Sequence, residues 1–221
     1  MHSGLMFFGT GVEAVVQVVG TVTASTATTT DMTLDLSAID IQSGDLILVA
    51  AASGGSSSVY LPMVSSGFTS LLEVGTASTY DTGLATYYKV ATGAETEVVV
   101  DSGSDTNAGK VVILYVLREV SDIDSQSGST SSSVIPPQVA ITSSSKLFAI
   151  CFFAGGSNLG SLEYTNSSLE GFQSVSANAN IYDMTLASGY SSFVGSFTPD
   201  ACGISGSDSA SYTAVAATLA L

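Results

Sequence analysis

The sequence predicts an all-β protein, an antiparallel β-sandwich, from three observations. Short runs rich in Val, Ile, Leu, Thr and Tyr recur along the 221 residues, clusters of Ser, Thr and Gly separate them, and no stretch has the apolar spacing of an amphipathic helix. Hydrophobic residues make up 45% of the chain and charged residues only 10%, so there is enough apolar material for a packed core. A chain of this size buries roughly 70% of its unfolded surface, which suits one large domain or two small ones.

Thirteen strands are expected, each a run of β-formers bounded by turn residues. The run from Met32 to Ser37 alternates strictly, with Met32, Leu34 and Leu36 on one face, as in a strand with one wet side. The expected strands lie at about 14–23, 32–37, 45–52, 68–75, 83–91, 95–101, 110–118, 136–142, 146–154, 172–177, 180–188, 192–198 and 211–220.

Three runs, 46–52, 111–117 and 147–154, are continuously apolar. In an all-β chain this pattern indicates strands buried on both faces, or strands whose outer face is covered by another subunit. Central sandwich strands with small outward residues such as Ala are an equal alternative.

The sequence contains a weak internal duplication. Residues 44–55 (GDLILVAAASGG) resemble residues 145–156 (SKLFAICFFAGG) at a lag of 101 residues, which places Gly54-Gly55 on Gly155-Gly156. The similarity continues from 83–93 to 184–190, and from 111–117 to 213–221. A doubled half of about 100 residues is expected to form two adjacent sandwiches or two halves of one jelly roll.

The expected organisation follows from this duplication. An N-terminal arm, 1–13, precedes a β-sandwich, 14–221, whose halves span about 14–120 and 135–221. A Ser/Gly/Pro-rich segment, 121–137, is expected to join them as a linker or an exposed loop.

Charge excludes several partners. The formal net charge is −15, and the only cations, Lys89, Lys110, Arg118 and Lys146, are too scattered to form a basic stripe. We therefore expect binding neither to nucleic acid nor to an anionic membrane surface. No apolar run approaches the ~20 residues of a membrane helix, and the N-terminus lacks the cations of a secretory signal, so no export is expected.

The residues that carry chemistry are few, and no enzyme activity or catalytic residue is expected. His2 is the single histidine, so a serine or cysteine nucleophile would have no base to activate it. Cys151 and Cys202 lack the paired spacing of a zinc site. Cys151 is expected to be an inert buried thiol, and a Cys151–Cys202 disulfide is the alternative.

Calcium is the one ligand that the sequence leaves open. Two loops carry carboxylates at short spacing, Asp101 with Asp105 and Asp122 with Asp124, and hard oxygen ligands suit Ca²⁺. Neither loop fits the EF-hand pattern. The alternative is that these side chains cap the backbone of their own turns. No other cofactor is expected.

The arm carries an apolar tip, Leu5, Met6, Phe7 and Phe8, followed by the glycines at 9 and 11. Such a tip on a glycine hinge suits docking onto a neighbouring protein, so these four residues are the candidate partner-binding site. The alternative is a first edge strand that packs into its own domain.

Several ordered motifs resemble a loosely defined group of phage and marine-virus structural proteins. In that group a strand that begins Gly-Asp-Leu precedes a Gly-aromatic-Thr turn and a Tyr-Lys-x-Ala-x-Gly-x-Glu hairpin. The corresponding residues here are 44–55, Gly67-Phe68-Thr69 and Tyr88 to Glu95, and the similarity covers about residues 44 to 154 with a weaker echo to 221. Phe68 stands where the group often has Trp.

The resemblance implies a virion structural protein with a jelly-roll β-sandwich and no catalytic residues. Within that class we expect a capsid decoration (cement) protein, made in the host cytoplasm and located on the capsid surface, that bridges subunits of the major capsid protein. A homo-oligomer, by analogy a trimer, is expected. The alternatives are a tail fibre, tailspike or adaptor module that contacts the host, and a carbohydrate-binding β-sandwich.

Overall fold

The computed structural model describes residues 15–55, 60–76, 81–120, 122–131, 133, 135–143, 148–157, 162–179, 181–205 and 213–221. Over these residues the protein is all-β, and every pairing between the named strands is antiparallel; one isolated parallel bridge joins Ala108 and Tyr182. The strands are β1 (Gln17–Thr26), β2 (Met32–Asp35), β3 (Leu46–Gly55), β4 (Thr69–Gly75), β5 (Asp81–Val90), β6 (Glu97–Val100), β7 (Lys110–Arg118), β8 (Ser125–Ser131), β9 (Ile141–Thr142), β10 (Phe148–Ser157), β11 (Glu163–Thr165), β12 (Glu170–Ala177), β13 (Asp183–Ser192), β14 (Ser196–Phe197), β15 (Gly203–Ser205) and β16 (Ala214–Ala220). No helix among the described residues is long and apolar enough to cross a membrane.

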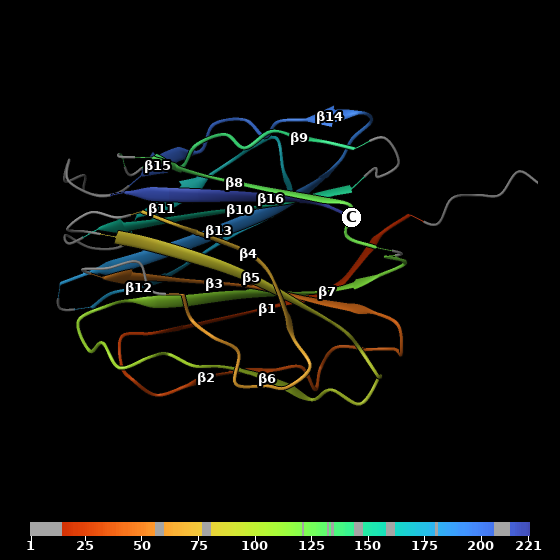
Figure 1. Cartoon of the computed structure of the whole chain (residues 1–221), viewed down its shortest axis with the longest axis horizontal. Coiled ribbons are helices and arrows are strands. Elements are labelled where there is room, and N and C mark those ends of the chain that lie inside the picture. Colours follow the sequence, from red (N-terminus) through yellow and green to blue (C-terminus); the bar gives the residue numbers. More distant parts are fainter. Residues whose placement is uncertain are drawn as a thin grey trace, which may run out of the picture.

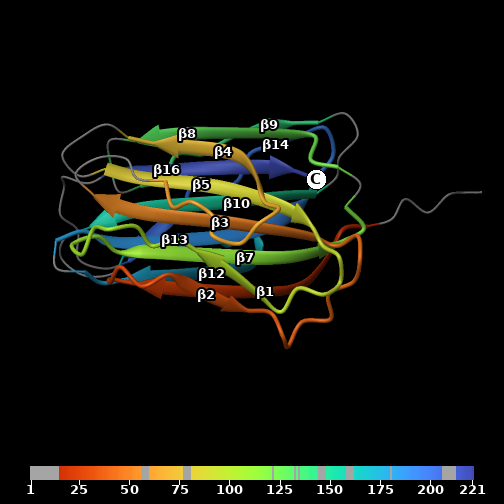
Figure 2. The same ribbon diagram turned by 60° about the horizontal axis from the view of Figure 1, so that its bottom comes forward.

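Two five-stranded sheets pack face to face and form the body of the molecule (Figures 1 and 2). The first has the strand order β1-β7-β3-β5-β4, and the second has the order β12-β13-β10-β16-β8. The expected antiparallel β-sandwich is therefore confirmed. The jelly-roll assignment stays a prediction.

The second half of the chain repeats the topology of the first half. In the first sheet β3 lies between β7 and β5, and in the second sheet β10 lies between the corresponding strands β16 and β13. Strands β5 and β13 share one burial pattern along ten residues, and β4 and β12 carry irregularities near their starts. Because β4 packs against β8 and β1 against β12, a pseudo-two-fold axis parallel to the strands relates the two sheets.

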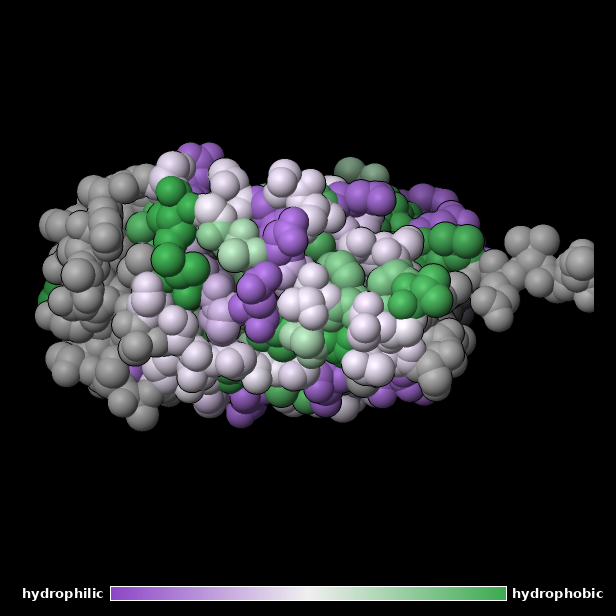
Figure 3. Space-filling model, turned by 90° about the horizontal axis from the view of Figure 1, so that it is seen from above, coloured by the Kyte–Doolittle hydropathy of each residue, from purple (hydrophilic) through white to green (hydrophobic). Residues whose placement is uncertain are grey.

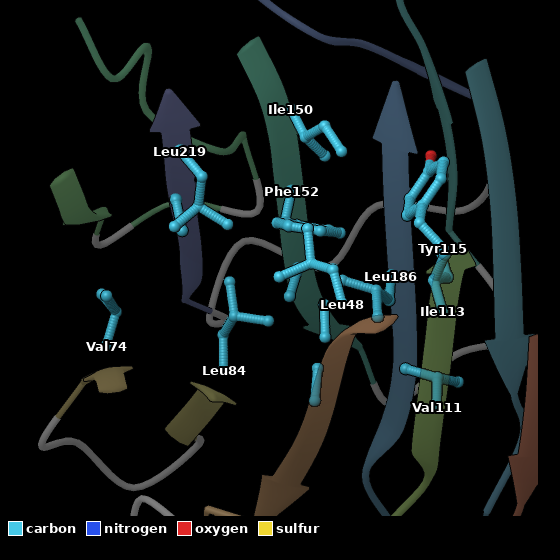
Figure 4. Packing of buried hydrophobic residues seen from close by; sticks show 14 of the residues in the cluster. Leu48, Val74, Leu84, Val111, Ile113, Tyr115, Ile150, Phe152, Leu186 and Leu219 are labelled. Atoms are coloured by element: carbon cyan, nitrogen blue, oxygen red, sulfur yellow. The ribbon is translucent and has the colours of Figure 1, made fainter. Parts of the chain in front are cut away.

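Each large sheet is covered on both faces by the same chain. The inner faces share a central core, in which Leu48, Phe152 and Leu186 meet (Figure 4). The pair β2-β6 covers the outer face of the first sheet, and β9-β14 with β11-β15 cover that of the second. This arrangement explains the continuously apolar runs: Leu48 lies in the central core and the adjacent Ile47 in the outer core of the first sheet.

Direct hydrogen bonds join the two halves at one end of the sandwich, which we call the stitched end. Gly109 N donates to Tyr182 O at 2.6 Å, Tyr182 N donates to Asn107 O at 3.0 Å, and Thr82 Oγ1 donates to Thr213 O at 2.8 Å. A β-carbon on Gly109 would lie only 2.5 Å from a carbonyl oxygen of β12. Glycine at 109 therefore permits the close approach of the halves.

The structure differs from the predicted strands mainly where the sequence lacks apolar residues. The prediction for 110–118 coincides with β7. However, residues 125–131, predicted to belong to a linker or exposed loop, form β8, which pairs with β16 over seven residues. Backbone pairing with β16, rather than side-chain burial, defines this strand, so its composition of Ser, Gln, Gly and Thr gave no signal. The three-residue strands β11 and β15 are too short to show an alternating pattern, although Tyr164 at the centre of β11 is buried.

Candidate functional site

β1 begins at the end opposite the stitched end, which we call the arm end because the N-terminal arm precedes β1 in the sequence. There Gln17 of β1 lies opposite Arg118 of β7, and Leu46 opposite Val90. The candidate partner-binding residues Leu5, Met6, Phe7 and Phe8 lie outside the described residues, so their role stays a prediction.

The three most exposed large hydrophobic side chains of the described residues all lie at the arm end. They are Val194 (86% exposed), Val15 (67%) and Val90 (58%), and we call them the end-face valines. Val15 precedes β1, Val90 ends β5, and Val194 follows β13, whose last residue Ser192 pairs at this end with the first residue of β10. The end at which β1 begins thus carries the most exposed large hydrophobic side chains of the described residues.

A buried carboxylate organises the loops of the arm end. Asp45, which follows the left-handed Gly44 (φ 97°), accepts hydrogen bonds from Arg118 Nε and Nη2, both at 2.9 Å, and from Gln42 N at 2.8 Å. The Arg118 guanidinium holds the pKa of Asp45 below its ordinary value, even though burial opposes it. The Arg118 Nη2 group also donates to the Asp40 carbonyl oxygen at 2.7 Å. This bidentate pair fixes the start of β3 to the end of β7.

A second carboxylate closes the hairpin that follows β5. Glu95 accepts hydrogen bonds from the backbone N–H groups of Thr92, Gly93 and Ala94 at 3.1–3.2 Å, and pairs with Lys89 Nζ at 3.0 Å. Burial alone would raise the pKa of Glu95, but the hydrogen bonds from Thr92 and Lys89 outweigh it and lower the pKa to about 2. Glu95 therefore stays ionised and holds this turn.

We call the ion pairs Asp45–Arg118 and Glu95–Lys89 the two clasps. They involve the motifs on which the resemblance to viral proteins rests. Gly44-Asp45 and the hairpin from Tyr88 to Glu95 supply both carboxylates, and a β-carbon at Gly67 (φ 84°) would lie 3.5 Å from the Lys89 side chain. Each of these charges is paired inside the protein, and the pairs hold the loops of the arm end together. The second half lacks this arrangement: Tyr190 is followed by two serines.

The four calcium candidates do not come together. Asp101 and Asp105 each accept a hydrogen bond from a backbone N–H two residues later, at 2.7 and 2.8 Å, which is the turn-capping alternative. Asp122 accepts from the next backbone N–H, and Asp124 from the Ser143 hydroxyl. Among the described residues no three His, Cys, Asp or Glu side chains gather around a common point. A calcium role for these residues stays a prediction.

Both cysteines are free and buried in the outer core of the second sheet. Burial raises the pKa of the Cys151 thiol to about 12 and that of Cys202 to about 11. The disulfide alternative is therefore not realised in this structure, and both thiols are poor nucleophiles in the folded protein.

The stitched end contains a buried lysine that the sequence did not single out. Lys110 is almost fully buried, and its Nζ donates to the carbonyl oxygens of Thr28, at 3.0 Å, and Asp105. Desolvation lowers the pKa of Lys110, against the opposing effect of the Asp105 charge. The lysine lines a cavity of about 80 Å³ together with Ser102, whose buried Oγ has no partner among the described residues. A cavity of this volume has room for ordered water beside Ser102 and Lys110.

No family model, curated protein sequence or solved structure matches this chain.

Proposed function

We propose that this protein is a non-enzymatic virion component, a capsid decoration protein that attaches to the outer shell and stabilises contacts between subunits of the major capsid protein. The observation that carries the proposal is the arm end. There β1 begins, and there the end-face valines expose their side chains, so this end offers apolar contacts to a partner; the apolar tip, 5–8, precedes it in the sequence.

The body suits a passive clamp. Its two large sheets are covered on both faces by the chain itself, and polar clasps fix the loops of the arm end. A protein that resists swelling of a shell needs a stiff body and a complementary contact area, and it needs no reactive group.

Weakly polar residues cover much of the face seen from above (Figure 3). In the space-filling view from above, apolar residues form separate patches among pale, weakly polar residues and a few strongly hydrophilic ones (Figure 3). The net charge of −15 adds solubility. Attachment by one end would leave such faces toward solvent.

Copy number in purified virions tests the proposal. A decoration protein is expected in a number comparable to that of the major capsid protein, whereas a tail protein is expected at a few to a few dozen copies. Quantitative gel densitometry of purified particles distinguishes the two. Absence of the protein from virions overturns the whole assignment, and binding to a glycan array that a chelator abolishes would support the carbohydrate-binding alternative instead.

Attachment to shells stripped of the protein locates the contact. Deleting residues 1–9 is expected to leave a folded domain that no longer cosediments with shells. Val194→Ser is expected to weaken cosedimentation, whereas the matched control Val64→Ser, which changes an exposed valine beside the small sheet β2-β6, is expected to leave it unchanged. Unchanged attachment of both the deletion and Val194→Ser would refute a contact through the arm end.

A further inference from the structure

The free edges of the two large sheets differ in how they are protected. Strands β1, β4, β8 and β12 form these four edges. A bulge or irregularity interrupts the pairing of β1, β4 and β12, and such features discourage the addition of a further strand. By contrast, β8 pairs with β16 through seven residues without a shift, and its sequence, SQSGSTS, contains no charge and no proline. Of the four edges in the described part of the chain, that of β8 is the one with neither a bulge nor a charge.

The backbone groups of β8 that point away from β16 can be identified. The bonds from Gly156 N to Thr213 O and from Leu221 N to Phe148 O show that odd-numbered residues of β16 bond to β10. Because backbone groups alternate along a strand, the even-numbered residues of β16 bond to β8, and their partners there are the odd-numbered serines. The outward N–H and C=O groups of β8 therefore belong to Gln126, Gly128 and Thr130.

We propose that β8 is a self-pairing edge, on which a second copy of this chain adds its own β8 antiparallel about a two-fold axis. The outward residues are symmetric about Gly128, the middle of the strand, so Gly128 would face Gly128 of the second copy, and Gln126 would face Thr130. Because the two-fold axis generates the pair of Gln126 and Thr130 twice, there are three pairs in all, and each exchanges two backbone hydrogen bonds. The two second sheets would then form one continuous sheet across the two molecules.

Charge favours a second copy as the occupant of this edge. Two chains of net charge −15 repel one another, so they are expected to meet where charge is lowest, and β8 carries none. The described side chains of β8 are exposed or half-buried, so the strand is accessible. Its serines and threonine also form hydrogen-bonded cross-strand pairs readily. This inference does not depend on the proposed viral function.

Sedimentation of the full chain over a range of concentrations tests the pairing. The parent protein is expected to show a monomer–dimer equilibrium. Thr130→Pro removes an outward N–H but no bond to β16, and Ser129→Lys places a charge on the edge, so each is expected to weaken the dimer at least about tenfold. Thr33→Lys makes the same charge change at an exposed position of β2. It is the matched control and is expected to dimerise as the parent does.

Cross-linking tests the register. In the proposed pairing residue 127 of one copy lies opposite residue 129 of the other as a non-hydrogen-bonded pair, with Cα atoms about 4.5 Å apart, which suits a disulfide. An oxidised mixture of Ser127→Cys and Ser129→Cys is expected to form a mixed disulfide dimer faster than either variant alone. The proposal is overturned if the parent is a monomer at every concentration, if both edge variants keep the parent's dimer affinity, or if the mixture cross-links no faster than the single variants.

Discussion

A hydrogen bond buried between the two halves allows a sharp test of how they are held together. The Tyr115 hydroxyl of β7 lies 2.6 Å from Ser188 Oγ of β13, and both residues are fully buried. The Tyr115 ring also packs edge-on against Phe152 at 6.2 Å. Tyr115→Phe keeps this ring contact but removes the hydroxyl, which leaves Ser188 without its partner across the central core.

The expected loss follows from the cost of stranding a buried polar group. That cost is about 1–3 kcal/mol, so Tyr115→Phe should lower the free energy of unfolding by about 2 kcal/mol. For a chain of this length the melting temperature should fall by roughly 4–8 °C. Circular dichroism melts and chemical denaturation at equilibrium measure both quantities. Tyr88→Phe changes a half-buried tyrosine and is the matched control, with little expected effect.

The double variant separates the hydrogen bond from other effects of substitution. Once the tyrosine hydroxyl is gone, Ser188→Ala removes a group that no longer has a partner, so Tyr115→Phe with Ser188→Ala should be no less stable than Tyr115→Phe alone. The coupling energy between the two sites should reach about 1 kcal/mol. A melting temperature of Tyr115→Phe equal to that of the parent, or single effects that simply add, would refute a bond that couples the halves.

Three further predictions concern the clasp at Glu95, the glycine at the stitched end and the thiols. Because the pKa of Glu95 is about 2 in the folded protein against an ordinary 4.5, its contribution to stability is present above about pH 4.5 and lost as the pH falls toward 2. The stability difference between the parent and Glu95→Gln, measured by denaturation at several pH values, should shrink over that range, and a pH-independent difference would contradict this account. Gly109→Ala should cost about 1–3 kcal/mol because its β-carbon meets backbone atoms, whereas Gly156→Ala, whose β-carbon would have 3.5 Å contacts, should cost less; equal melting temperatures for the two variants would be the contrary result. Cys151 and Cys202 should react with a thiol reagent at pH 8 only after unfolding, and rapid labelling of the native protein would show that they are accessible.

The sequence predicted most of the fold because apolar patterning follows burial. The run 110–118 is apolar at nearly every position, and it forms the strand β7 that both cores cover. The glycine pair used to align the halves ends β3 and occupies the corresponding part of β10. The apolar pattern of the sequence does not show which strands are neighbours in a sheet. Residues Ser125–Ser131 form a strand only because tertiary structure places them beside β16.

The candidate site was less accessible to sequence reasoning. The exposure of Val194 depends on the turn after β13, and a single valine between Phe193 and Gly195 gives no signal of exposure. The ion pair of Asp45 and Arg118 joins residues 73 positions apart, which spacing alone does not reveal. By contrast, the hairpin motif from Tyr88 to Glu95 was visible because its contacts are local.

The confinement of strand pairing to each half also sets an order of events during synthesis. Every pairing of the first large sheet is available once residue 118 has left the ribosome, yet the inner face of that sheet, with Leu48 and Ile113, has no cover until the second half follows. The nascent chain therefore passes through a stage with a finished sheet and an open apolar face. The second half of a neighbouring nascent chain presents an equivalent sheet, so it fits the open apolar face as well as the chain's own second half does. Covering by the neighbour gives a domain-swapped dimer, and slow synthesis would favour it.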